Sequence, residues 1–180
     1  AHKRANNNTD SIDIEIKKQD GGYVYVVRDY GNSMDKNTIA DVYVKLGKSD
    51  KRDSNNEHGG WGLGAASPLA YTDHFWIETW TEEEGHNIYR KWVQYIDPSR
   101  VGALSLLEED EWIDGKTGTQ VIIPFEKKDL APVLDALNFY LSYTEAKYNF
   151  KSEIEDVNIN ISRLWYSHFG TNWAMYIHED

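Results

Sequence analysis

The sequence predicts an α+β fold, a two-layer α/β sandwich in which helices cover one face of a mainly antiparallel sheet. Three observations support this prediction. Segments with the apolar and polar alternation of strands recur along the chain, tight turns join them in pairs, and one later segment has helical spacing. With 180 residues, 40% of them hydrophobic, the chain is long enough to bury a core as one domain with a short extension.

The first two strands are expected to form a hairpin. Ile12, Ile14 and Ile16 alternate with charged residues, which is typical of a half-buried strand. The aspartate and two glycines at 20–22 predict a tight turn, and the β-branched and aromatic run at 23–27 follows it. This arrangement predicts an antiparallel pair.

A second hairpin is expected where residues 75–80 and 88–96 flank the acidic turn at 82–87. Further strands are expected near residues 103–107 and 119–125. A helix should follow, with Asp129 as its N-cap. Its apolar face is predicted from residues that recur at helical spacing, namely Leu130, Val133, Leu134, Leu137 and Leu141.

The composition excludes several classes of site. A formal net charge of −11 repels nucleic-acid phosphates, and the basic cluster at 45–52 is interrupted by an aspartate, as in a solvated loop. The absence of cysteine excludes disulfides, thiolate zinc sites and cysteine nucleophiles. The six histidines lack metal-ligand spacing. No apolar run approaches the ~20 residues that span a bilayer.

The aromatic residues are numerous, with seven tryptophans and twelve tyrosines. Most lie in strand-like runs, where packing on a sheet is their usual role, so we expect core positions for Trp76, Trp80 and Trp92. Trp61 lies within a glycine-rich segment. There it either packs beneath the loop or contacts a ligand, and the sequence leaves both interpretations open.

That glycine-rich segment, residues 58–68, is the most informative stretch of the chain. Its four glycines all lie within residues 59–64, and the segment then continues as a helix-compatible run. Glycine accepts positive φ and lets a ligand approach the backbone, and a following helix would direct the positive end of its dipole at an anion. The segment therefore indicates a phosphate-binding loop, although plain turn chemistry gives the same composition.

Two other segments strengthen the nucleotide interpretation. Asp29 follows the strand-like run at 23–27, and a carboxylate there can accept a hydrogen bond from an adenine amino group. Gly31, two residues later, leaves room for a flat base against the backbone. Farther along, the run at 47–51 reads Gly-Lys-Ser-Asp-Lys, and Gly118 and Thr119 lead into a strand.

The four elements stand in one order: Asp-x-Gly-x-x-Met, Gly-x-Ser-x-Lys, a glycine-rich lid, and Gly-Thr before a strand. In this order the chain resembles the GHKL ATPases, which include gyrase, the heat-shock chaperone, histidine kinases and MutL. The run at 67–75 is most similar to the rIIA-like proteins of tailed phages. The resemblance covers about residues 1–150, implies the Bergerat-type ATP-binding fold, and leaves residues 151–180 as the start of a following segment.

The resemblance implies a set of ATP-binding residues, with adenine held by Asp29 and Thr119 and the phosphates held by the lid. The full set is Asp29, Gly31, Met34, Ser49, Lys51, Gly60, Gly62, Leu63, Gly64, Ala65 and Thr119. Two departures from the family pattern bear on affinity. Ser33 stands where a second glycine is usual, and Ala66 stands where a lysine is common.

The family's first motif, a helix carrying the glutamate that activates water and the asparagine that holds magnesium, is not found in this sequence. We therefore expect a domain truncated after that helix, with no catalytic residue and no metal ligand within the chain. Magnesium would be bound through a ligand outside it. ATP hydrolysis would belong to an intact parent protein.

These observations predict the ATP-binding domain of an rIIA-like GHKL ATPase, with ATP and Mg²⁺ as cofactors and a protein partner or a second copy as partner. Direct nucleic-acid binding is not expected. The expected location is the cytoplasm, that of the host cell for a phage protein, or the membrane periphery. The alternatives are a non-catalytic protein-interaction module and a DNA-processing ATPase of the MutL or gyrase type.

Overall fold

A computed structural model describes residues 11–44, 64–112, 115–142, 147–159, 166–169 and 174–176. The strands of the main sheet are β1 (Ile12–Gln19), β2 (Gly22–Arg28), β3 (His74–Glu83), β4 (His86–Ile96), β5 (Gly102–Glu111), β6 (Gly118–Phe125) and β7 (Tyr148–Ser152). The α-helices are α1 (Lys36–Val44) and α2 (Leu130–Ser142). Two 3₁₀ helices, η2 (Gly64–Ala70) and η3 (Lys127–Asp129), and the short strands β8 (Tyr166–Phe169) and β9 (Ala174–Tyr176) complete the described elements.

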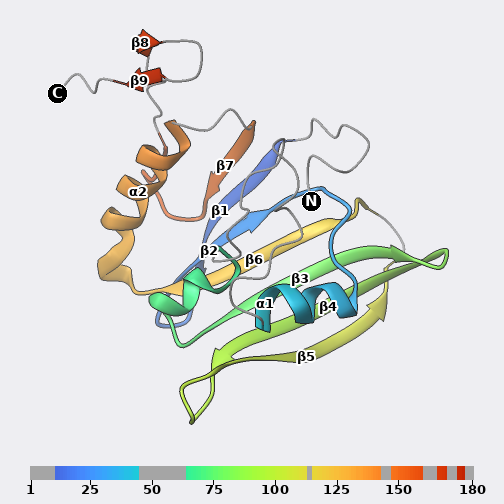
Figure 1. Ribbon diagram of the computed structural model, residues 1–180. Coiled ribbons are helices and arrows are strands. Elements are labelled where there is room, and N and C mark those ends of the chain that lie inside the picture. The colour runs from blue at the N-terminus through green and yellow to red at the C-terminus, as the bar shows by residue number, and fades with distance from the viewer. Residues whose placement is uncertain are drawn as a thin grey trace.

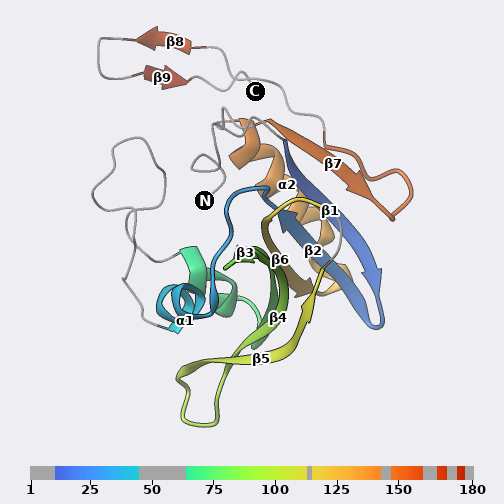
Figure 2. The same cartoon turned by 90° about the vertical axis from the view of Figure 1, so that its right-hand side faces the viewer.

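The centre of the fold is a seven-stranded sheet with the order β5-β4-β3-β6-β2-β1-β7 (Figure 1). Neighbouring strands are antiparallel except at one edge, where β7 pairs with β1 in parallel. The view turned by 90° shows that the sheet is strongly twisted from β5 to β7 (Figure 2). Such a twist follows from the handedness of L-residues in extended strands. Strands β8 and β9 form a separate antiparallel pair.

The predicted two-layer α/β sandwich was wrong. The fold is dominated by the sheet, with 49% strand and 23% helix, and the part of the chain that the structure describes contains two α-helices. Two helices of nine and 13 residues are too short to form a continuous layer over seven strands. The sheet is also mixed, because residues 148–152 return beside β1 after α2.

Both predicted hairpins are confirmed. In the first, Ile16 lies opposite Tyr25, and Ile14 and Ile16 are buried, as their alternation predicted. In the second, Ile77 lies opposite Trp92 in a ten-residue register between β3 and β4. The strands expected near 103–107 and 119–125 correspond to β5 and β6. Alternation therefore located these strands because each buries one face.

The helix α1 was not anticipated. Asp35 caps it, because the Asp35 carboxylate accepts a hydrogen bond of 2.7 Å from the Thr38 N–H. This bond is the main reason why the pKa of Asp35 lies below its ordinary value. On the buried side, Ile39 and Tyr43 contact the sheet at the spacing of one helical turn. The cap and this spacing are the signals that could have predicted α1.

One core cluster lies between α1 and the middle of the sheet. Its buried residues are Ile39, Tyr43, Phe75, Ile77 and Trp92. Partly buried side chains pack against them, including Met34 and Val121. Of the three tryptophans expected in the core, Trp92 is buried, whereas Trp76 and Trp80 are only partly buried on the opposite face of β3. This cluster fixes α1 over the strands that carry the candidate site.

A second core cluster lies under α2. Leu137 packs there with Ile14, Ile16 and Phe125, so the apolar face predicted for this helix is confirmed. The predicted N-cap is not confirmed. Asp129 ends η3, and its carboxylate accepts a hydrogen bond from the Tyr71 hydroxyl. From residues 151–159, the side chains of Ile154, Val157 and Ile159 also pack against this cluster.

Candidate functional site

The end of β2 places Asp29 beside the start of β6. The Asp29 N–H donates a hydrogen bond of 2.9 Å to the Thr119 carbonyl, which continues the β2–β6 pairing. The Asp29 carboxylate in turn accepts a hydrogen bond of 2.8 Å from the Gly31 N–H. This tight turn holds the carboxylate in one orientation, so its second oxygen is fixed as an acceptor.

Gly118 makes this close approach possible. Its φ is +149°, and a Cβ placed on it would lie 2.0 Å from the Asp29 carbonyl oxygen. Any side chain at this position would push the two segments apart, since real Cβ atoms do not approach a carbonyl so closely. The Gly-Thr pair therefore has a structural explanation: glycine brings Thr119 next to Asp29.

Two hydroxyl groups meet at the same place. The Ser33 Oγ lies 3.2 Å from the Thr119 Oγ1, within hydrogen-bond distance. Ser33 holds a left-handed backbone with φ of +62°, a conformation that costs a non-glycine residue about 1 kcal/mol. The departure noted in the sequence thus has two consequences here, a strained backbone and a side chain that engages the Thr119 hydroxyl.

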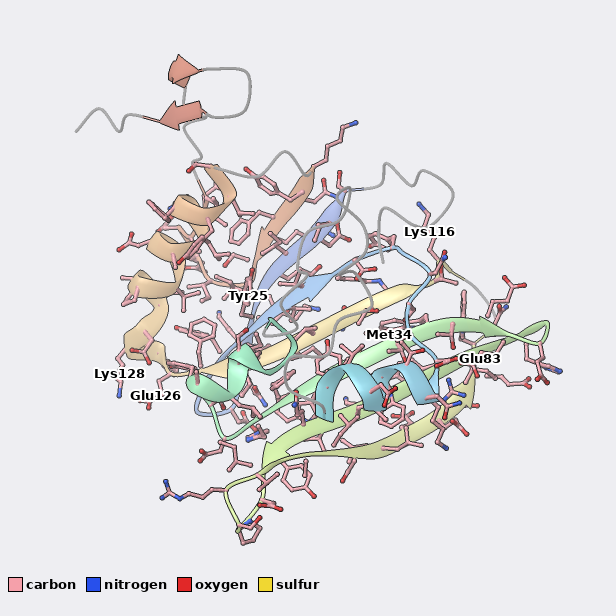
Figure 3. All side chains as sticks on the ribbon, viewed as in Figure 1. Tyr25, Met34, Glu83, Lys116, Glu126 and Lys128 are labelled. Carbon is pink, nitrogen blue, oxygen red and sulfur yellow. The ribbon has the colours of Figure 1, made fainter. Side chains whose placement is uncertain are left out.

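The apolar side of the site comes from α1 and the loop before it. Met34 packs against the core cluster beneath α1, and Figure 3 shows it at the N-terminal end of that helix. Tyr43 is buried on the inner face of α1, its ring 6.2 Å from that of Phe75. Burial raises the pKa of Tyr43, and the negative charge of Asp29 raises it further. The Asp29 carboxylate therefore lies near enough to the Tyr43 hydroxyl for its charge to raise that pKa.

Strand β3 supplies a floor that sequence reasoning missed. Thr79 lies directly opposite Thr119 in the β3–β6 register and is wholly buried. Its hydroxyl has no hydrogen-bond partner within the part of the chain that the structure describes. Threonine is common in strands, so only the burial and the pairing distinguish this residue.

Arg90 lies across β3 from Thr119, but its charge is already engaged. The side chain is 7% exposed and makes ion pairs with Glu83 and Glu109. These carboxylates raise the pKa of Arg90, and Arg90 lowers the pKa of both Glu83 and Glu109. A cavity of about 570 Å³ opens beside this cluster and includes Asp35 and Glu84 in its wall. Its surplus of carboxylates disfavours a phosphate ligand.

A larger cavity, of about 600 Å³, lies elsewhere on the sheet. It opens where the β1–β2 turn, the segment after η2 and the β6–α2 junction meet, and Tyr71, Trp76 and Asp129 belong to its wall. The Tyr71 hydroxyl donates to Asp129 and accepts from the Glu126 N–H, so part of this wall is internally bonded. Asp29 and Thr119 do not line it.

The structure therefore brings together three residues of the predicted site, Asp29, Gly31 and Thr119, whereas Met34 packs against the core cluster beneath α1. Gly64 and Ala65 begin η2, a seven-residue 3₁₀ helix with a proline inside it, where the sequence predicted a helix behind the lid. The other predicted residues, Ser49, Lys51, Gly60, Gly62 and Leu63, lie outside the described residues. The predicted contribution of the lid to phosphate binding stays a prediction.

The described residues contain no group of three or more His, Asp or Glu side chains arranged to hold a metal ion. None of the helices in the same part of the chain is both long and apolar enough to cross a membrane.

No family model matches the chain, and no curated protein matches it. The nucleotide interpretation therefore depends on the motifs in the sequence and on the geometry around Asp29.

Proposed function

We propose that this protein binds ATP, with the adenine base at the junction of β2 and β6, beside the loop that leads into α1. The observation that supports this proposal is the meeting of Asp29 and Thr119, which are 90 positions apart in the sequence and hydrogen-bonded through their backbones. A fixed carboxylate, a hydroxyl and an apolar wall are the groups expected in a site for a flat base with one polar edge.

The carboxylate of Asp29 would read the base. One oxygen accepts the Gly31 N–H, and the other accepts no hydrogen bond from the described residues that the structure records. An adenine amino group is a donor and suits this oxygen, whereas guanine presents a carbonyl acceptor at the same ring position. A carboxylate facing an acceptor would remain unpaired, so the site should favour ATP over GTP.

Met34, which is only partly buried, would contact a face of the base. It packs against the apolar cluster under α1, so the base would lie at the edge of that cluster. In this proposal the phosphates contact the backbone of the glycine-rich lid, and magnesium is bound through a ligand outside the chain. The first of these expectations comes from glycine chemistry and the second from the family resemblance.

The test is calorimetric titration of ATP and GTP into the chain and two variants. Asp29→Asn keeps an oxygen for the Gly31 N–H but removes the charge, so ATP binding should weaken by about 1–3 kcal/mol and GTP binding by less. Asp20→Asn, in the β1–β2 turn, removes the same charge away from the site and should bind ATP like the parent. Equal losses for both nucleotides would refute base reading by Asp29.

One observation favours a second candidate, a protein-interaction module. Ser33 engages the Thr119 hydroxyl, which an incoming base would also need. A chain that binds neither ATP nor GTP in this titration, and whose Ser33→Gly variant also binds neither, would support the module over the nucleotide site.

A further inference from the structure

Strands β3 and β6 separate at one end of the sheet, and the larger cavity opens there. Their pairing ends at Trp76 and Ile122, although β6 continues beside β2. The cavity of about 600 Å³ has Trp76 and Pro124 in its wall. Its volume lies within the usual range of small-molecule sites, about 300–1,000 Å³. It is distinct from the proposed nucleotide site, because neither Asp29 nor Thr119 lines it.

Two aromatic rings in this wall are held in place by their neighbours. Tyr71 is 53% exposed, yet its hydroxyl donates a hydrogen bond to Asp129 and accepts one of 3.3 Å from the Glu126 N–H. The bond to Asp129 is the main reason why the pKa of Tyr71 lies above its ordinary value. The Trp76 ring contacts the His74 ring edge to face at 4.9 Å. Rings that are already ordered cost little further entropy when a ligand binds against them.

The charged side chains of the cavity are mostly acidic. Four carboxylates and one lysine line it, and Lys128 already forms an ion pair of 2.9 Å with Glu126 (Figure 3). Asp129 is engaged by the tyrosine hydroxyl. The other two carboxylates, those of Asp20 and Asp73, are exposed and make no hydrogen bond or ion pair with the residues that the structure describes. The cavity therefore attracts a cation, as does the net charge of the chain.

We propose that this cavity binds a linear alkyl diamine. Asp20 lies in the β1–β2 turn and Asp73 directly before β3, so each can bind one ammonium group through a charge-assisted hydrogen bond. The aliphatic chain would lie against Trp76 and Tyr71, whose ring faces also attract a nearby cation. The cavity is large enough to enclose a whole small molecule, which favours a free amine over one lysine side chain of a partner.

The test is calorimetric titration of the chain with cadaverine, which has two ammonium groups on a five-carbon chain, and with pentylamine, which has one. The buffer holds about 0.15 M salt, so that charges more than about 8 Å apart are largely screened. No nucleotide is present, because amines bind its phosphates. Cadaverine should bind one to one and about tenfold more tightly than pentylamine, because pentylamine can engage only one of the two carboxylates.

The variants separate the carboxylates from the aromatic ring. Asp20→Asn and Asp73→Asn should each weaken cadaverine about tenfold and pentylamine by less, because pentylamine can use the remaining carboxylate. Asp135→Asn, on an exposed position of α2 outside the cavity, removes the same charge and should bind cadaverine like the parent. Trp76→Leu should weaken both amines by the same factor, and Trp76→Phe, which keeps an aromatic face, should restore most of the affinity.

Five results would overturn the inference. The first is that the parent does not bind cadaverine, and the second is that it binds pentylamine equally well. An equal loss in Asp135→Asn would show that the amine responds to net charge alone. Unchanged binding by Trp76→Leu would remove the ring from the site. Tighter binding of an acetylated trilysine peptide than of cadaverine would assign the cavity to a partner protein. None of these results affects the proposed nucleotide site, which the ATP and GTP titrations test separately.

Discussion

The carbonyl oxygen of Asp29 occupies the space that a side chain on residue 118 would need. The distance of 2.0 Å between this oxygen and an ideal Cβ on Gly118 makes the glycine a requirement of the β2–β6 junction. The same junction carries the backbone hydrogen bond between Asp29 and Thr119. Base recognition in the proposed site therefore depends on a residue that would not itself touch the base.

The first prediction concerns Gly118→Ala. The added methyl group must displace the Asp29 backbone, so the variant should lose about 3 kcal/mol of stability and bind ATP weakly. Gly85→Ala is the matched control. Gly85 also has positive φ, at +83°, but nothing lies within 4 Å of its added Cβ. That variant should lose about 1 kcal/mol, from backbone strain alone.

Urea denaturation and ATP titration of both variants test this prediction. An equal loss of stability in the two variants would show that the positive φ, and not the contact with Asp29, explains the need for glycine at position 118.

The second prediction concerns Ser33→Gly. Glycine adopts the left-handed backbone at this position without strain and removes the hydroxyl from Thr119. The Thr119 hydroxyl then becomes available to a ligand, so ATP should bind about tenfold more tightly. Ser33→Ala removes the same hydroxyl but keeps the strain, and it should gain most of the same affinity.

Calorimetric titration with ATP measures both variants against the parent. Weaker binding by both would mean that Ser33 contacts the nucleotide itself instead of competing with it.

The third prediction concerns Arg90→Met and acidic pH. Arg90 lowers the pKa of Glu83, so this ion pair contributes stability above the unfolded pKa of glutamate. That contribution is lost as the pH falls below about 4.5 and passes through the lowered pKa that Glu83 has in the folded protein. At pH 7 the variant should lose about 2 kcal/mol, a modest loss because both glutamates are partly exposed to solvent.

Denaturation curves from pH 3 to pH 7, about the range in which glutamate titrates, test this prediction. The variant should show a shallower loss of stability at acidic pH than the parent. Lys17→Met is the control, because Lys17, which pairs with Glu15, is 42% exposed where Arg90 is 7% exposed, and its loss should change stability by less than about 1 kcal/mol. Identical pH profiles for the parent and Arg90→Met would show that the ion pair of Arg90 with Glu83 does not contribute to the loss of stability at acidic pH.

Much of the sheet could be predicted from the sequence, because strands that bury one face show it by alternation. Ile14 and Ile16 on β1 and the hairpin of β3 and β4 are examples. The parallel partner of β1 could not be predicted, since β7 is a five-residue strand that follows α2. The helical layer was overestimated because the resemblance implied helices that the described residues do not contain.

The candidate site was predictable in its chemistry but not in its pairing. Motif order singled out Asp29 and Thr119, and a strand end and a Gly-Thr pair are visible in the sequence. That Arg28 lies opposite Gln120, and so sets Asp29 beside Thr119, follows only from long-range pairing. Thr79 gave no signal, because a buried threonine and an exposed one look alike in a sequence.

The parallel pairing of β7 with β1 has a kinetic consequence. Ile12 pairs with Tyr148, so β1 emerges from the ribosome before its outer neighbour, which follows only after more than 130 further residues. During that interval one edge of β1 is open to any other extended chain, and such edges template aggregation. Closing so long a loop is slow compared with forming a hairpin, so completion of this edge should limit the folding rate.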